Sequence, residues 1–138
     1  ISLDVAASLN LDAVRISRTP LFTAFAGMGQ LIGRLGLFTL SELSLWKAKR
    51  RHFRVPDHFE GIVAGEAVHE GHFLHILKDL RPGTTEVMMH PGTDNEKLIP
   101  ACDWEHDFEA EMQAIVSPKV RRMIADKAVK IVNYRDLK

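Results

Sequence analysis

The chain of 138 residues lacks the cysteine pairs, the excess basic charge and the long uncharged apolar run that mark disulfide-bonded, nucleic-acid-binding and membrane-spanning proteins. It holds one cysteine, Cys102, so no internal disulfide can form, and a lone thiol fits a reducing compartment such as the cytoplasm. Basic and acidic side chains number 18 each, and this zero net charge argues against a nucleic-acid partner. The apolar run 31–46 contains Arg34 and Glu42, which argues against a membrane span. We therefore expect a cytoplasmic protein with neither a nucleic-acid nor a membrane partner.

The composition that remains is that of an ordinary globular protein, with 46% hydrophobic and 26% charged residues. A chain of this length fits one domain over 1–138 with one core. Helical and strand patterns alternate, which favours an α/β fold with a parallel sheet. About four strands are expected, at 13–16, 59–63, 85–90 and 129–133.

Helical patterns fill most of the sequence between these strands. Apolar spacing predicts helices over 2–10, 24–52 and 66–80, the second of them rich in glycine and open to division into two pieces. Residues 93–101 are polar and are expected to form a loop. Asp103 is a candidate N-cap for an acidic helix whose apolar stripe runs through Phe108 and Ile115. Ser117 followed by Pro118 is typical of a further helix start.

The strand pattern 85–90 ends in a histidine and a turn, His90-Pro91-Gly92. Functional groups of open α/β sheets and (β/α) barrels sit at the carboxyl ends of strands. Pro91 restricts His90 to an extended backbone, and Gly92 permits a turn directly after it. Histidine suits proton transfer near neutral pH. His90 is therefore a candidate catalytic residue, and the alternative is a histidine that only caps a loop.

Other histidines offer further candidates. His69, His72 and His75 lie along one side of the predicted helix 66–80 and could hold a metal, although that side is also the one expected to face water. His106 lies in an acidic helix start, where it either faces a substrate or balances charge.

Three motifs of the sequence belong together. They are Thr85-Glu86-Val87-Met88-Met89-His90-Pro91-Gly92, the acidic helix with Ser117-Pro118-Lys119-Val120, and the closing Ile131-Val132-Asn133-Tyr134-Arg135-Asp136-Leu137. Together they resemble the YdjC-like carbohydrate deacetylases. Ala13-Val14-Arg15-Ile16 and Asp57-His58-Phe59-Glu60-Gly61 extend the likeness over nearly the whole chain. A subgroup associated with hopanoid biosynthesis is similar in layout, including a glycine-rich stretch before Trp46.

This resemblance implies a partial (β/α) barrel that belongs to a metal-dependent carbohydrate N-deacetylase. Its substrate would be a small carbohydrate with an N-acetylated amino sugar, and its cofactor a divalent ion, Mg or Zn. By the same resemblance His90 would protonate the leaving amine, and Arg15 would lie at the pocket as a substrate-binding residue. Glu86, also assigned to substrate binding, would either orient His90 or pair with Arg15.

The sequence departs from the family at the metal site. It has no Asp-Asp pair and no His-x-His motif, which supply the family's metal ligands. We therefore expect the C-terminal part of such an enzyme, inactive alone and unable to hold the metal fully. Such a part is expected to form a homo-oligomer or to associate with the missing N-terminal half. The alternatives are a non-catalytic, self-associating α/β domain and a metal-binding module built on His69, His72 and His75.

Overall fold

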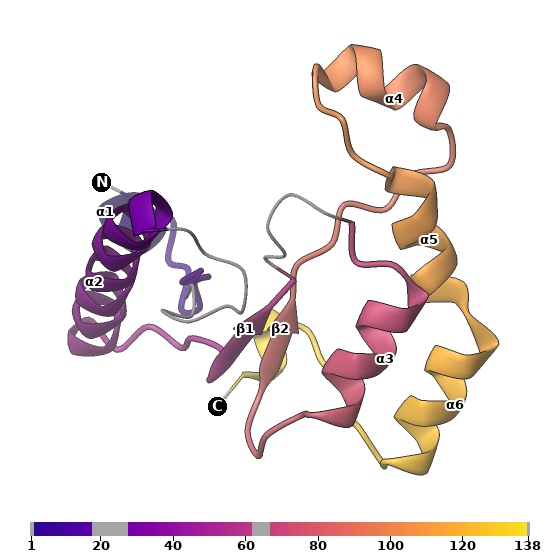
Figure 1. The fold of residues 1–138 in the computed structure, drawn as a ribbon. Coiled ribbons are helices and arrows are strands. Elements are labelled where there is room, and N and C mark those ends of the chain that lie inside the picture. Colours follow the sequence, from indigo (N-terminus) through magenta and orange to yellow (C-terminus); the bar gives the residue numbers. More distant parts are fainter. Residues whose placement is uncertain (1, 18–27, 62–66, 138) are drawn as a thin grey trace. The chain divides into compact units, whose positions relative to one another are not determined.

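The computed structural model describes residues 2–17, 28–61 and 67–137 and combines helices with a small parallel sheet (Figure 1). In chain order the elements are α1 Ser2–Ser8, α2 Met28–Arg50, β1 His58–Glu60, α3 Glu70–Lys78, β2 Thr85–Val87, α4 Asn95–Cys102, α5 Phe108–Val116, α6 Pro118–Asp126 and the 3₁₀ helix η1 Tyr134–Asp136. Among the described residues, no helix has both the length and the apolar character needed to cross a bilayer.

Parallel pairing is the feature that agrees with the α/β prediction. The strands β1 and β2 form a two-stranded sheet, with backbone bonds from His58 N to Thr84 O and from Met88 N to Glu60 O, both 3.0 Å. Ala13 and Arg54 form an isolated parallel bridge. The predicted strand 129–133 is wrong, because these residues have no strand partner among the described residues and a strand needs a ladder to persist. The partial barrel stays a prediction.

Contacts divide the chain into two compact units, which are described separately. The first comprises residues 1–59, 83–86 and 132–138, and the second comprises residues 60–82 and 87–131. The single domain expected from chain length stays a prediction.

The first unit has a small core between α1 and the end of α2. Ala6, Ala48 and Phe53 are buried there, and half-buried apolar side chains from 3, 14, 16 and 55 pack against them. The described residues of the glycine-rich region, 28–50, form one continuous helix rather than two. Residues 24–27 of the predicted helix lie outside the described part of the chain.

The second unit is built from α3, α5 and α6, which pack against one another, while α4 packs against α5. Val68, Leu77, Phe108 and Ala114 are among its most buried apolar side chains. Ser117 is buried as the N-cap of α6, accepting from the N–H groups of residues 119 and 120, as Ser-Pro predicts.

Two expectations for this unit are wrong. The predicted loop 93–101 contains the helix α4, because the Asp94 side chain accepts the Lys97 N–H at 3.0 Å and so caps a helix start. Asp103 is not the N-cap of the next helix. It ends α4 in a left-handed conformation (φ 48°), and Asp107 caps α5 instead.

Candidate functional site

His90 lies in the segment that follows β2, three residues beyond the end of the strand. Its backbone N–H donates to the Glu111 carboxylate, and the Gly92 N–H donates to the Phe108 carbonyl at 2.9 Å. Two backbone N–H groups, one bonded to a side-chain carboxylate and one to a backbone carbonyl, therefore fasten the His90-Pro91-Gly92 turn to the first turn of α5. The predicted strand 85–90 is wrong at its end, because β2 stops at Val87 and the half-buried His90 lies in an irregular segment beyond the carboxyl end of that strand.

The turn lies so close to α5 that position 92 must be a glycine. A Cβ atom built on it would come within 2.9 Å of the Phe108 Cβ and would also overlap the Leu98 side chain. No larger residue fits without displacing the turn from α5.

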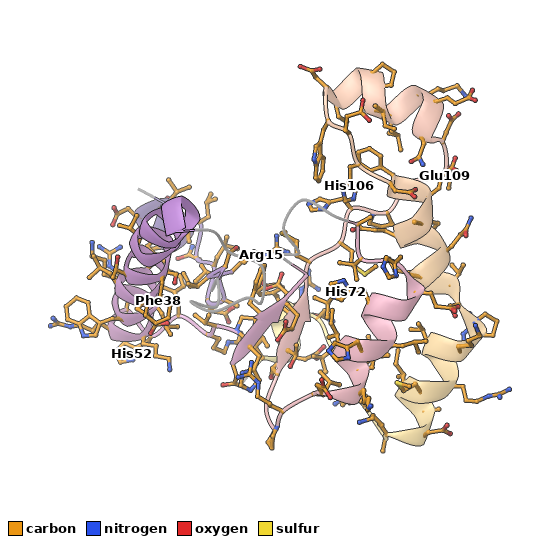
Figure 2. All side chains as sticks on the ribbon, in the orientation of Figure 1. Arg15, Phe38, His52, His72, His106 and Glu109 are labelled. Atoms are coloured by element: carbon orange, nitrogen blue, oxygen red, sulfur yellow. The ribbon has the colours of Figure 1, made fainter. Side chains whose placement is uncertain are left out.

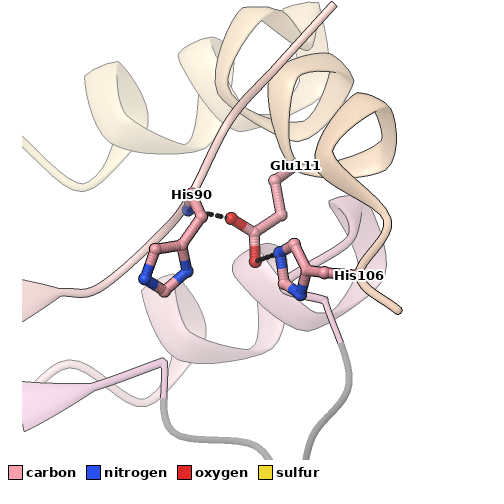
Figure 3. Close-up of side chains that lie close together, drawn as sticks. All are labelled: His90, His106 and Glu111. Carbon is pink, nitrogen blue, oxygen red and sulfur yellow. Dashed lines mark hydrogen bonds and ion pairs between the residues drawn. The ribbon is translucent and has the colours of Figure 1, made fainter. Parts of the chain in front are cut away.

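Glu111 lies at the centre of the site and is 1% exposed. One carboxylate oxygen accepts the Val68 N–H at 2.9 Å, and the other accepts the His90 N–H. The first oxygen also lies 3.3 Å from Nε2 of His106. Figure 3 shows the carboxylate between the two histidines, with one oxygen toward each residue. These partners supply the polar contacts that a buried carboxylate needs.

His106 is buried, with a side chain only 3% exposed. It stands just before α5 (Figure 2) and stacks on the Trp104 ring, at a centroid distance of 4.2 Å and an interplanar angle of 23°. Its ring meets those of His90 and Phe108 edge-on, at 5.5 and 4.9 Å. Of the two roles considered for His106, charge balance agrees with the ion pair to Glu111, and the aromatic neighbours enclose the ring. A substrate-facing role stays a prediction.

His90, His106 and Glu111 bring three ligand atoms within 4.8 Å of one another. Two imidazoles and one carboxylate form a donor set of the kind that zinc accepts in proteins. The cluster, which we call the His90 cluster, belongs wholly to the second unit.

Arg15 and Glu86, the other predicted site residues, lie together in the first unit. Arg15 Nε donates to Glu86 Oε1 at 2.5 Å, and the Tyr134 hydroxyl donates to the other oxygen of the same carboxylate. The guanidinium also lies 5.9 Å from the centre of the Phe59 ring. Of the two roles considered for Glu86, the described contacts are those of pairing with Arg15.

Electrostatics support this group, which we call the Arg15 triad (Arg15, Glu86 and Tyr134). The hydrogen bond to Glu86 raises the pKa of Arg15, so the cation is fixed. Burial, followed by the hydrogen bond to the Glu86 carboxylate, raises the pKa of Tyr134. The tyrosine therefore stays a hydrogen-bond donor well above neutral pH.

The histidines of α3 form no comparable group among the described residues. His69 caps the helix, with its side chain accepting the His72 N–H at 3.3 Å, and His75 pairs with Asp79 at 3.4 Å. His69 and His75 are exposed, as the water-facing interpretation expects.

Comparison with known proteins agrees with the motifs. The sequence model of the family described as YdjC-like protein matches residues 1–126. The chain belongs to the YdjC-like family. A carbohydrate deacetylase of Thermoanaerobacter pseudethanolicus is 29% identical to it over 82 residues. That match covers 59% of this chain and 33% of the relative, so the chain spans about a third of the relative's length. No solved structure matches. The narrower assignment to the hopanoid-associated subgroup stays a prediction.

Glu111 is the residue of this YdjC-like chain that sequence reasoning missed. The sequence predicts an acidic helix whose apolar stripe runs through Ile115, yet Ile115 is 44% exposed. The buried face instead contains Phe108, Glu111 and Ala114, three residues apart. A carboxylate at core spacing between Phe108 and Ala114 was the available signal.

Proposed function

We propose that this chain is the C-terminal part of a carbohydrate N-deacetylase that hydrolyses the acetamide of an amino sugar. Three observations support the proposal: the YdjC-like family, the carbohydrate deacetylase that resembles the chain, and the place of His90 in the anchored turn beyond the carboxyl end of a parallel strand. The mechanism rests on the position of His90, because the turn that contains this proton-transfer group is stiff and anchored.

His90 donates the proton in this mechanism. Hydrolysis of an acetamide releases acetate and an amine, and the leaving nitrogen must gain a proton as the C–N bond breaks. Pro91 restricts the His90 backbone, and Glu111 holds its N–H, so the imidazole keeps one approach to the substrate. Glu111 therefore acts as a positioning residue.

The Arg15 triad binds substrate in the same proposal. The guanidinium is half-exposed, with its side chain at 49%, while Glu86 is at 11%. Glu86 and Tyr134 hold Arg15, and the half-exposed guanidinium would orient an acyl oxygen or a carboxylate of the substrate. Glu86 binds substrate indirectly, through the orientation of Arg15.

A divalent ion, Mg or Zn, would polarise the acyl oxygen and activate water in the complete enzyme. The His90 cluster does not fit this catalytic ion, because a metal on the imidazole removes the lone pair that His90 needs for proton transfer. We therefore propose that the catalytic ion is held by residues outside this chain and that the chain alone is inactive.

The test is deacetylation by the complete protein, measured as acetate released from N-acetylated amino sugars. His90→Ala should lower kcat by roughly 10²- to 10⁴-fold, the usual contribution of general acid–base catalysis. His75→Ala, which removes an exposed histidine of the same unit, should leave the rate unchanged. An equal rate in the wild type and His90→Ala would overturn the assignment.

A second candidate function is a non-catalytic, self-associating domain. Leu40, Leu43 and Trp46 favour it, since they follow one another at spacing three on α2 and are 61%, 46% and 53% exposed. The absence of acetate release by the complete protein, together with stable oligomers, would support this candidate over the enzyme.

A further inference from the structure

We propose that His90, His106 and Glu111 form a binding site for a zinc-type transition-metal cation, separate from the catalytic ion considered above. The ligands would be one nitrogen from each imidazole and one oxygen of the carboxylate, with a fourth position left for water. The existence of this site does not rest on the deacetylase proposal. Its consequence does, because a cation on His90 would block proton transfer.

The distance between the His106 and Glu111 ligand atoms fits such a cation as it stands. The Nε2 atom of His106 lies 3.3 Å from Oε1 of Glu111. Zinc bonds of roughly 2.0 Å in a tetrahedron separate neighbouring ligand atoms by about 3.3 Å. All three donors lie within 4.8 Å of one another. A modest rotation of the half-buried His90 ring would complete the set, and Figure 3 shows that ring beside the carboxylate.

His106 supplies an independent reason to expect a ligand. Neither of its ring nitrogens has a hydrogen-bond partner among the described residues, although the side chain is 97% buried, since 3% is exposed. A buried polar atom without a partner is uncommon in a native protein and points to a bound water or ion. Nδ1 has no hydrogen-bond partner among the described residues, and Nε2 lies at ion-pair distance from a carboxylate oxygen. A cation between the two atoms would satisfy both.

The surroundings are those of a prepared metal site. The oxygens of Glu111 accept the N–H groups of Val68 and His90, and each oxygen keeps a second lone pair for a metal. Hydrogen bonds to a ligating carboxylate orient it and tune its affinity. The rings of Trp104 and Phe108 pack against His106 and keep water from that side.

Occupancy would couple this site to the proposed chemistry. Coordination uses an imidazole lone pair, so a metal-bound His90 can neither carry nor donate a proton at that nitrogen. We therefore expect such a cation to inhibit the complete enzyme at concentrations above those that fill its catalytic site.

Cobalt(II) titration of the 138-residue chain tests the site directly, since tetrahedral cobalt bound to nitrogen and oxygen absorbs visible light. We expect one cobalt per chain, displaced by zinc, and a thermal unfolding midpoint that rises with zinc concentration. His90→Ala and His106→Phe should each weaken cobalt binding at least about tenfold. That is the smallest loss of metal affinity typical even for mutation of residues that only hydrogen-bond to a ligand. His106→Phe keeps a ring for Trp104 to stack on, and circular dichroism verifies that each variant is folded.

His75→Ala is the matched control, because it removes an exposed histidine of the same unit outside the cluster. Its affinity should equal that of the wild type. Absence of a tetrahedral cobalt spectrum, or loss of binding in His75→Ala but not in the cluster variants, would overturn the proposal. The readout needs no catalysis, so a failure of this site is distinct from a failure of the deacetylase assignment.

Discussion

Tyr134 is the single tyrosine of the chain, so its ionisation can be followed without interference. Its pKa is raised first by burial and then by the hydrogen bond to Glu86, while Arg15 acts in the opposite direction. The folded-state pKa lies above the unfolded value of about 10, so the protonated tyrosine contributes fully to the free energy of unfolding below about pH 10. This contribution is lost as pH rises through the folded-state pKa.

We expect Glu86→Gln to lower the pKa of Tyr134, measured as tyrosinate absorbance during a pH titration. The change removes the negative charge that opposes ionisation and leaves Arg15 to favour the phenolate. Asp4→Asn is the control, since it removes an exposed carboxylate of the same unit that pairs with Arg51. A pKa unchanged by Glu86→Gln would contradict the hydrogen bond between Tyr134 and Glu86.

At the scale of single residues, the sequence predicted His90, Arg15 and Glu86 as site residues but not the contacts that each of them makes. Pro91 and Gly92 indicated the turn, because proline restricts the backbone locally and glycine gives it more freedom. The pairing of Arg15 with Glu86 joins positions 71 residues apart. From the sequence alone, Glu86 could equally have oriented His90. His106 and Glu111 are buried among neighbours that include Trp104, Val68 and the His90 turn.

At the scale of elements, Gly61 at the end of β1 has a positive φ of 96°. A Cβ there would overlap the Met88 backbone. We expect Gly61→Ala to lower the free energy of unfolding by at least about 1–3 kcal/mol, the cost of a strained left-handed residue, measured by chemical denaturation.

Gly36→Ala is the matched substitution with the opposite sign. Gly36 is exposed within α2, and a Cβ there would meet nothing within 4 Å. Alanine should therefore stabilise by roughly 0.5–1 kcal/mol through helix propensity. Equal effects of the two alanines would show that the close approach of Gly61 to Met88 is not formed.

Helix starts were predictable where a capping side chain stood next to its helix, as at Ser117. The same rule failed at 93–101 because the polar run conceals Asp94 as a cap, and α4 is only 8 residues long. The failure at 129–133 has another cause. β-branched residues fit a strand, yet a strand is completed only by a neighbour that donates and accepts along its edge.

At the scale of the whole molecule, exposed apolar side chains predict self-association. Leu40 and Leu43 are 61% and 46% exposed on one side of α2. We expect the 138-residue chain to elute as an oligomer in size exclusion with light scattering, and Leu40→Ser with Leu43→Ser to shift it toward the monomer. The control is the exposed polar pair Lys49→Ser with Arg50→Ser. A compact wild-type monomer would contradict the expectation.

The sequence by itself determined the family, the combination of helices with parallel strands, and the turn that carries His90. These follow from local rules: residue periodicity, backbone restriction by proline and glycine, and motifs that lie within a few residues. Only the tertiary structure decided that Glu111 binds the His90 backbone, that His106 is enclosed beside it, and that Glu86 pairs with Arg15 and Tyr134. Such contacts join residues distant in the chain, and burial and charge pairing depend on what covers a side chain rather than on its neighbours in sequence.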